Sequence, residues 1–177
     1  MNELIERLQK NFDAFDFKAQ KPALGFIHVP KEKAEMMIRH LRDFEGYTHL
    51  SFFTTVDYIE QGIFRLIYML HNYDTRHDLG VHVDIDRENA TMQSIHPLWA
   101  QAADYQRELK EMFGIDFPGS PRVDESFMLE SWVDIPPMRK EFDTHEYVQR
   151  TFFPRPGRET NEPRVYMKKK LYPDAEG

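Results

Sequence analysis

Asp78-Leu-Gly-Val-His-Val-Asp-Ile-Asp86 is the stretch that decides the fold. Apolar side chains alternate with glycine and polar residues, so an extended strand here would have one apolar face. Two earlier stretches, 49–59 and 63–72, are rich in the β-branched and aromatic residues that suit a pleated surface. Short polar turns separate the three stretches, and the sequence therefore predicts an antiparallel three-stranded meander.

Apolar residues at helical spacing flank this meander. The first dozen residues carry one apolar stripe, and a second amphipathic segment covers 31–43 after a short strand candidate at 24–29. A third helix is expected to open at 94–97 and to end at Gly114. This order indicates an α+β fold, a small and mainly antiparallel sheet with helices packed on one face.

The composition changes after residue 117. Eight of the chain's eleven prolines lie in the last 60 residues, and such a sequence disfavours both sheet and long helix. Aromatic residues are nevertheless frequent there, so these side chains should be buried against the chain's own domain or another subunit. We therefore expect an α+β domain over 1–117 and an extended proline-rich arm and tail over 118–177.

Composition and charge exclude several classes of protein. The chain of 177 residues contains no cysteine, which excludes disulfides, thiolate nucleophiles and cysteine-ligated zinc or iron–sulfur sites. The net charge of −7 argues against a dedicated nucleic-acid binder, although the residues from Arg150 onward carry a net +3. Neither a signal peptide nor a stretch long enough to cross a bilayer is expected.

Motifs that carry chemistry are missing from this sequence. It contains neither glycine-rich phosphate loops nor the zinc-binding HExxH pattern. Asp104 and Glu108 lie one helical turn apart and could act as paired carboxylates of a small hydrolase, or could simply belong to a charged outer helix face. A free-standing adaptor using its proline-rich arm is a further alternative, weakened because Pro154-Arg-Pro156 lacks a PxxP core. The pattern favours an assembly component over a self-sufficient enzyme.

Residues 105–117, Tyr-Gln-Arg-Glu-Leu-Lys-Glu-Met-Phe-Gly-Ile-Asp-Phe, resemble the signature of a known family. The family is the 30 kDa subunit of NADH dehydrogenase, a component of respiratory complex I. The strand 50–58, which ends in Val-Asp-Tyr, and the Pro-Met-Arg-Lys-Glu-Phe element at 137–142 are similar to further family segments. The segment 119–125 departs from the family pattern, which suggests a divergent member from a membrane-bound [NiFe] hydrogenase or another complex I-like oxidoreductase.

The resemblance implies a hydrophilic structural subunit that binds no cofactor of its own. Its implied partners are a catalytic large subunit and an iron–sulfur small subunit, which would hold the iron–sulfur clusters and, in hydrogenases, nickel–iron. Its implied location is peripheral, on the cytoplasmic side of the membrane and bound only through partner subunits. The residues that the family motif assigns to partner contact are Arg107, Glu108, Met112, Phe113, Gly114, Ile115, Phe117, Gly119, Trp132, Arg139 and Lys140.

Overall fold

The computed structural model describes residues 2–157 and 162–171. The chain divides into two compact units, Met1–Arg139 and Lys140–Gly177. The sequence placed a boundary at residue 117, whereas the unit that holds the sheet continues to Arg139. Each unit is described by itself below.

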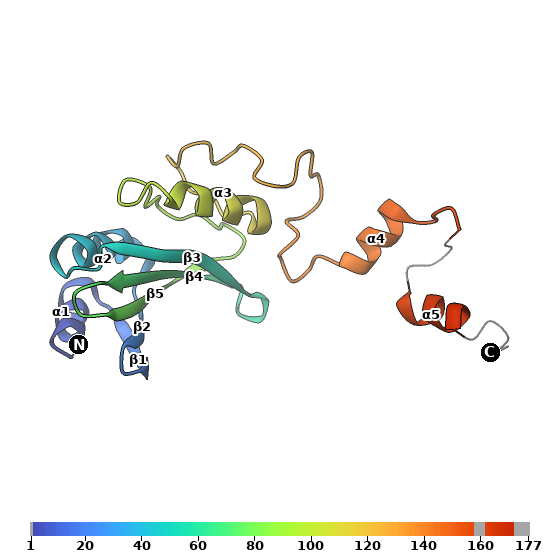
Figure 1. Cartoon of the computed structure of the whole chain (residues 1–177). Coiled ribbons are helices and arrows are strands. Elements are labelled where there is room, and N and C mark those ends of the chain that lie inside the picture. Colours follow the sequence, from blue (N-terminus) through green and yellow to red (C-terminus); the bar gives the residue numbers. More distant parts are fainter. Residues whose placement is uncertain (1, 158–161, 172–177) are drawn as a thin grey trace. The chain divides into compact units, whose positions relative to one another are not determined.

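A five-stranded sheet forms the centre of the first unit, in the order β1-β2-β5-β4-β3 (Figure 1). The predicted meander is confirmed, because β4 pairs antiparallel with both β3 and β5. β2 joins β5 in parallel and β1 pairs antiparallel with β2, so the sheet is mainly antiparallel, as expected. The strands are β1 (Phe15–Lys21), β2 (Leu24–His28), β3 (His49–Tyr58), β4 (Ile63–Asn72) and β5 (His77–Asp86).

The core lies between one face of the sheet and three helices. Leu66 of β4 lies beside Val83 of β5 in the register, and both side chains are fully buried. Alternate residues of both strands fill the same layer, since side chains of a strand alternate between its faces. The helices contribute Leu8, Met37 and Leu109 to this core. They are α1 (Asn2–Phe12), α2 (Lys31–Phe44) and α3 (Ala102–Phe113), and the α+β fold is thus confirmed.

Two elements of this unit differ from the sequence prediction. β1 was not predicted. Phe15, Phe17 and Ala19 do alternate with polar residues, but the stretch is short and six of its seven residues are exposed. α3 begins at Ala102 and not at 94–97, since the preceding residues form successive tight turns, with the Leu98 amide donating to the Ile95 carbonyl. A 3-10 turn, η1 (Ile59–Gln61), connects β3 to β4.

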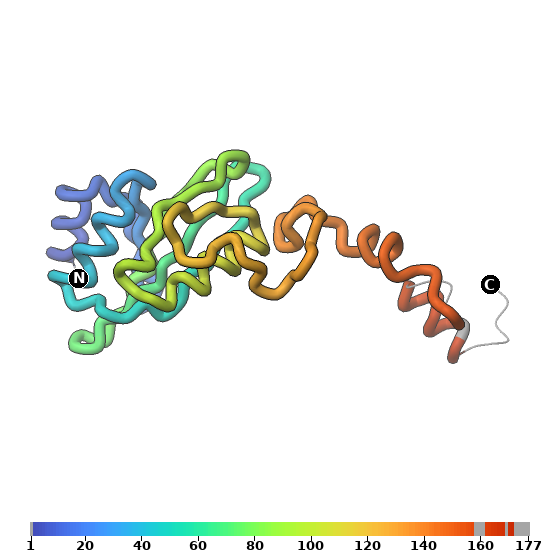
Figure 2. Tube along the Cα trace, turned by 90° about the horizontal axis from the view of Figure 1, so that it is seen from above, coloured from blue at the N-terminus to red at the C-terminus, as the bar shows by residue number. Residues whose placement is uncertain are grey.

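Residues 118–139, which we call the covering segment, contain neither helix nor strand. They run back along α3 in the first unit (Figure 2). The described part of the second unit forms α4 (Thr144–Phe152) and α5 (Pro163–Leu171), where the sequence predicted an extended arm. Asp143 caps the N-terminus of α4, because its carboxylate accepts a hydrogen bond from the Glu146 amide at 2.9 Å. Among the described residues, no helix is long and apolar enough to cross a membrane.

Candidate functional site

The covering segment is fastened to α3 by charged side chains that bind its backbone. Arg107 donates from Nη2 to the Ser126 carbonyl at 2.7 Å. Glu111 accepts hydrogen bonds from the amides of Phe127 and Met128, both at 2.7 Å. These amides hold the pKa of Glu111 below its usual range, although partial burial acts in the opposite direction. α3 therefore holds the middle of the covering segment mainly through its backbone, and the Arg107 guanidinium also lies over the Phe127 ring, 5.5 Å from its centroid.

Lys110 fastens the beginning of the covering segment. Its ammonium lies 2.5 Å from Asp116 and 2.8 Å from Asp124. Burial tends to lower the pKa of Lys110, but the hydrogen bonds to these two carboxylates outweigh it and raise that pKa. Lys110 also lines a cavity of about 380 Å³ between α3 and the covering segment, together with Glu111, Val123, Leu129 and Trp132 among others.

The far end of the covering segment is bound where α3 ends. Gly114 ends the helix with a left-handed φ of 75°, and the Met138 amide donates to the Met112 carbonyl at 3.0 Å. Arg139 donates from Nε to the Phe113 carbonyl at 2.7 Å. A Cβ atom on Gly114 would lie 3.2 Å from both Arg139 Nη2 and Pro136 Cγ, so glycine allows both the turn and the close approach.

Aromatic side chains pack this helix end onto the sheet. Phe113 meets Phe64 of β4 edge to face, with centroids 6.0 Å apart. The fully buried Phe117 meets Phe53 of β3 in the same way at 5.7 Å. Such edge-to-face pairs stabilise packing beyond the area that they bury. The guanidinium of Arg139 lies over the same Phe64 ring, at 5.2 Å from its centroid.

A buried ion pair lies under this junction and was missed by sequence reasoning. Arg87 donates from Nε and Nη2 to the two carboxylate oxygens of Asp57, at 2.8 and 3.0 Å, and the Asp57 side chain is only 3% exposed. Arg87 also lies over the Phe64 ring at 5.4 Å. Thirty residues separate the two partners along the chain, and only the strand register brings them together.

The remaining motif residues lie around this junction. Ile115 is fully buried, and Gly119 forms a turn in which the Ser120 amide donates to the Phe117 carbonyl at 3.0 Å. Trp132 donates from Nε1 to the Ile135 carbonyl at 3.0 Å. Glu108 is exposed on α3, as is Asp104 one turn before it, and Lys140 is exposed at the start of the second unit. The assignment of these residues to partner contact stays a prediction.

Several apolar side chains of the covering segment are exposed. Val133 is 97% exposed and Met128 is 70% exposed, and neither helps to fill the core. We call the five exposed apolar side chains of this segment the apolar ridge. They are Phe127, Met128, Val133, Ile135 and Met138. A set of exposed apolar side chains on an anchored segment is typical of a protein–protein contact.

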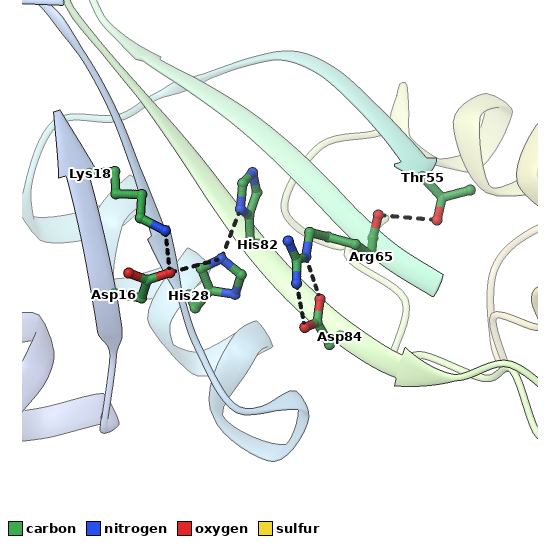
Figure 3. A network of polar contacts seen from close by, with 7 residues as sticks. All are labelled: Asp16, Lys18, His28, Thr55, Arg65, His82 and Asp84. Atoms are coloured by element: carbon green, nitrogen blue, oxygen red, sulfur yellow. Dashed lines mark hydrogen bonds and ion pairs between the residues drawn. The ribbon is translucent and has the colours of Figure 1, made fainter. Parts of the chain in front are cut away.

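A second polar cluster lies on the face of the sheet that the helices leave open (Figure 3). His28 of β2 and His82 of β5 are cross-strand neighbours, with His82 Nδ1 3.2 Å from His28 Nε2. Asp16 of β1 approaches the same His28 nitrogen at 3.9 Å. Beside them, Arg65 forms a two-pronged ion pair with Asp84, at 2.7 and 2.8 Å.

Burial favours the neutral form of both imidazoles. Desolvation lowers the pKa of His82 to about 4, with a further contribution from His28. Desolvation followed by the charge of Arg65 lowers the pKa of His28. The hydrogen bonds from Arg65 hold the pKa of Asp84 below its usual range. Among the described residues, no group of three or more acidic or histidine side chains is placed to hold a metal ion. The expectation that the chain carries no cofactor stays a prediction.

Comparison with known proteins places this architecture in a family. The model of the family described as "Respiratory-chain NADH dehydrogenase, 30 Kd subunit" matches residues 27–148, which run from β2 into α4. The chain belongs to this family. The resemblance found in residues 105–117 is thereby confirmed.

The curated relatives carry corresponding names. The C subunit of NADH-quinone oxidoreductase from Moorella thermoacetica is 28% identical over 142 residues, covering 80% of this chain and 95% of that protein. The C/D subunit of NADH-quinone oxidoreductase from Pseudomonas fluorescens is 27% identical over 152 residues, covering 79% of this chain and 25% of that longer protein.

A solved structure confirms the fold at lower sequence similarity. A chain of the membrane-bound sulfane sulfur reductase, an archaeal respiratory membrane complex, superimposes with a TM-score of 0.68 at 23% identity. The match covers 90% of this chain and 98% of that chain. At this identity the likeness concerns the fold alone.

Proposed function

We propose that this chain is a structural subunit of the hydrophilic arm of a complex I-like, membrane-associated electron-transfer complex. It binds no redox centre itself and braces the catalytic large subunit and the iron–sulfur small subunit. These partners hold the iron–sulfur clusters and, if the complex is a hydrogenase, nickel–iron. The chain lies on the cytoplasmic side and reaches the membrane only through its partners.

The anchored covering segment with its apolar ridge carries this proposal. Charged side chains of α3 hold the backbone of residues 125–128, and Arg139 holds the far end. The backbone that carries the ridge is therefore already ordered before a partner binds, which lowers the conformational-entropy cost of binding. A segment that served only the chain's own stability would direct its methionine and valine side chains inward.

Two findings fit the assembly of this chain beside a larger subunit. The Pseudomonas fluorescens relative is named as a C/D subunit, and this chain covers a quarter of it, so a region like this chain is joined there to a much longer one. The fold also matches a chain from a respiratory membrane complex along almost its whole length. Both fit a subunit that works beside a larger catalytic neighbour.

Co-purification from the native host tests the proposal. A tagged chain should retrieve a large catalytic subunit and an iron–sulfur subunit, identified by mass spectrometry and by the visible absorbance of the clusters. The double substitution Val133→Asp and Met138→Asp should reduce the retrieved partners at least ~10-fold, because it places two charges in a desolvated contact.

The matched control is Met36→Asp, which charges a 52% exposed side chain on α2. It should leave retrieval unchanged, and circular dichroism should show that all variants are folded. Failure of the tagged chain to retrieve redox subunits would overturn the assembly proposal. Full retrieval of the partners by the double variant would show that assembly does not depend on the apolar ridge.

A further inference from the structure

Among the described residues, side chains cap the first part of the outer edge of β3 and leave the next part uncapped. β3 is the last strand of the sheet, and within the described ranges nothing pairs with its outer side. At its beginning, side chains near the start of α3 occupy backbone carbonyls. Trp99 binds the Thr48 carbonyl at 2.8 Å and Gln101 binds the Leu50 carbonyl at 2.5 Å. The first part of the edge is thus capped from within the chain.

The next part of the same edge has no such cap. The backbone from Phe52 to Val56, which we call the free edge, takes part in ladder bonds to β4, and no described side chain caps its outer groups. Alternate residues of an edge strand direct their N–H and C=O groups outward, and such groups form a template for another strand. The free edge follows a register shift between Leu50 and Phe52.

The side chains around the free edge define what could pair with it. Phe52 is 41% exposed and Val56 is 38% exposed, and their spacing of four places both on the open face of the sheet. On the opposite side, Asp104 and Glu108 are exposed on the flank of α3 that also carries Gln101. A strand added here would therefore meet apolar groups on one face and carboxylates on the other.

We infer that the free edge receives an extended segment of a partner subunit as a sixth strand. The segment would alternate apolar side chains toward Phe52 and Val56 with lysine or arginine toward Asp104 and Glu108. Backbone hydrogen bonds supply the attraction in this mode of recognition, and the alternating side chains supply specificity. This inference rests on the proposed assembly with partner subunits and concerns a surface separate from the apolar ridge.

Hydrogen–deuterium exchange on the assembled complex tests the pairing directly. The amides of Phe52–Val56 that point outward should exchange at least ~10-fold more slowly in the purified complex than in the isolated chain, because pairing removes them from water. The double charge reversal Asp104→Lys and Glu108→Lys should abolish that protection, and Glu32→Lys on the exposed side of α2 should not.

Each outcome separates the two proposals. If the chain co-purifies with its redox partners but the amides of Phe52–Val56 exchange at the same rate in both states, strand addition is wrong and the proposed function stands. If the isolated chain shows protection that increases with protein concentration, the occupant is a second copy of this chain, and the inference is overturned. If no redox subunit is retrieved at all, the proposed function fails first.

Discussion

Mild acidification should destabilise the sheet through His82. The imidazole lies between β2 and β4 on the open face, beside His28 of β2 and the Arg65–Asp84 pair. Burial and these neighbours lower its pKa to about 4, against 6.5 for an ordinary histidine. Protonation would place a cation next to His28 and Arg65, with Asp84 already engaged by Arg65.

The sign and size of the effect follow from proton linkage. Between pH 6.5 and about pH 4, His82 is protonated in the unfolded chain but not in the folded chain. The free energy of unfolding therefore falls as the pH falls. Without solvent screening, the part of this loss that falls between about pH 7.5 and about pH 5 is about 2 kcal/mol. Solvent screening at this half-buried ring brings the expected loss to about 1 kcal/mol. Below pH 4 this histidine adds no further loss.

Urea denaturation at a series of pH values measures this loss, with tryptophan fluorescence and circular dichroism as probes. The wild-type chain should lose about 1 kcal/mol more between about pH 7.5 and about pH 5 than the variant His82→Asn, whose side chain does not titrate. His145→Asn, at an exposed position of the second unit, serves as the matched control and should follow the wild type. An equal loss in wild type and His82→Asn would refute the reasoning.

Three further predictions concern the junction at the end of α3. Arg87→Met should lower the free energy of unfolding by about 3–5 kcal/mol, because it removes the two-pronged ion pair that Arg87 forms with the buried Asp57 carboxylate; urea denaturation measures this. Gly114→Ala should cost about 1–2 kcal/mol and speed proteolysis of the covering segment, and Gly119→Ala, which has open space around it, should cost only the backbone strain, about 1 kcal/mol or less. Glu111→Gln should speed hydrogen exchange at the amides of Phe127 and Met128, which donate hydrogen bonds to the Glu111 carboxylate. Unchanged exchange at these amides would show that Glu111 does not hold the covering segment.

The central sheet could be predicted because its alternation is set by burial on one face. β5 was located almost to the residue from the apolar side chains at every second position, and β4 from its run of apolar and aromatic residues. β1 was overlooked although Phe15, Phe17 and Ala19 alternate with polar residues, because the stretch is short and only Phe17 among its residues is partly buried. α4 did leave a signal, an Asp143 cap followed three residues later by Glu146, but the nearby prolines outweighed it in the prediction.

The candidate site was predictable only in part. Gly114 follows from general rules for the end of an apolar helix stripe, whereas Phe113 was singled out only through the family resemblance. The fastening of the covering segment does not follow from such rules, because the bonds of Arg107 and Glu111 end on backbone atoms, which every residue type provides. The Arg87–Asp57 pair also escaped prediction, since its formation depends on which strands become neighbours.

Attachment through main-chain atoms has an evolutionary consequence. Because α3 recognises amides and carbonyls of residues 125–128, these backbone bonds can survive an exchange of the side chains, although replacing Phe127 would remove its ring contact with Arg107. Selection can then reshape the outward surface for a different neighbour and leave the scaffold beneath it untouched. One architecture could in this way accompany oxidoreductases of differing chemistry at little cost in foldability.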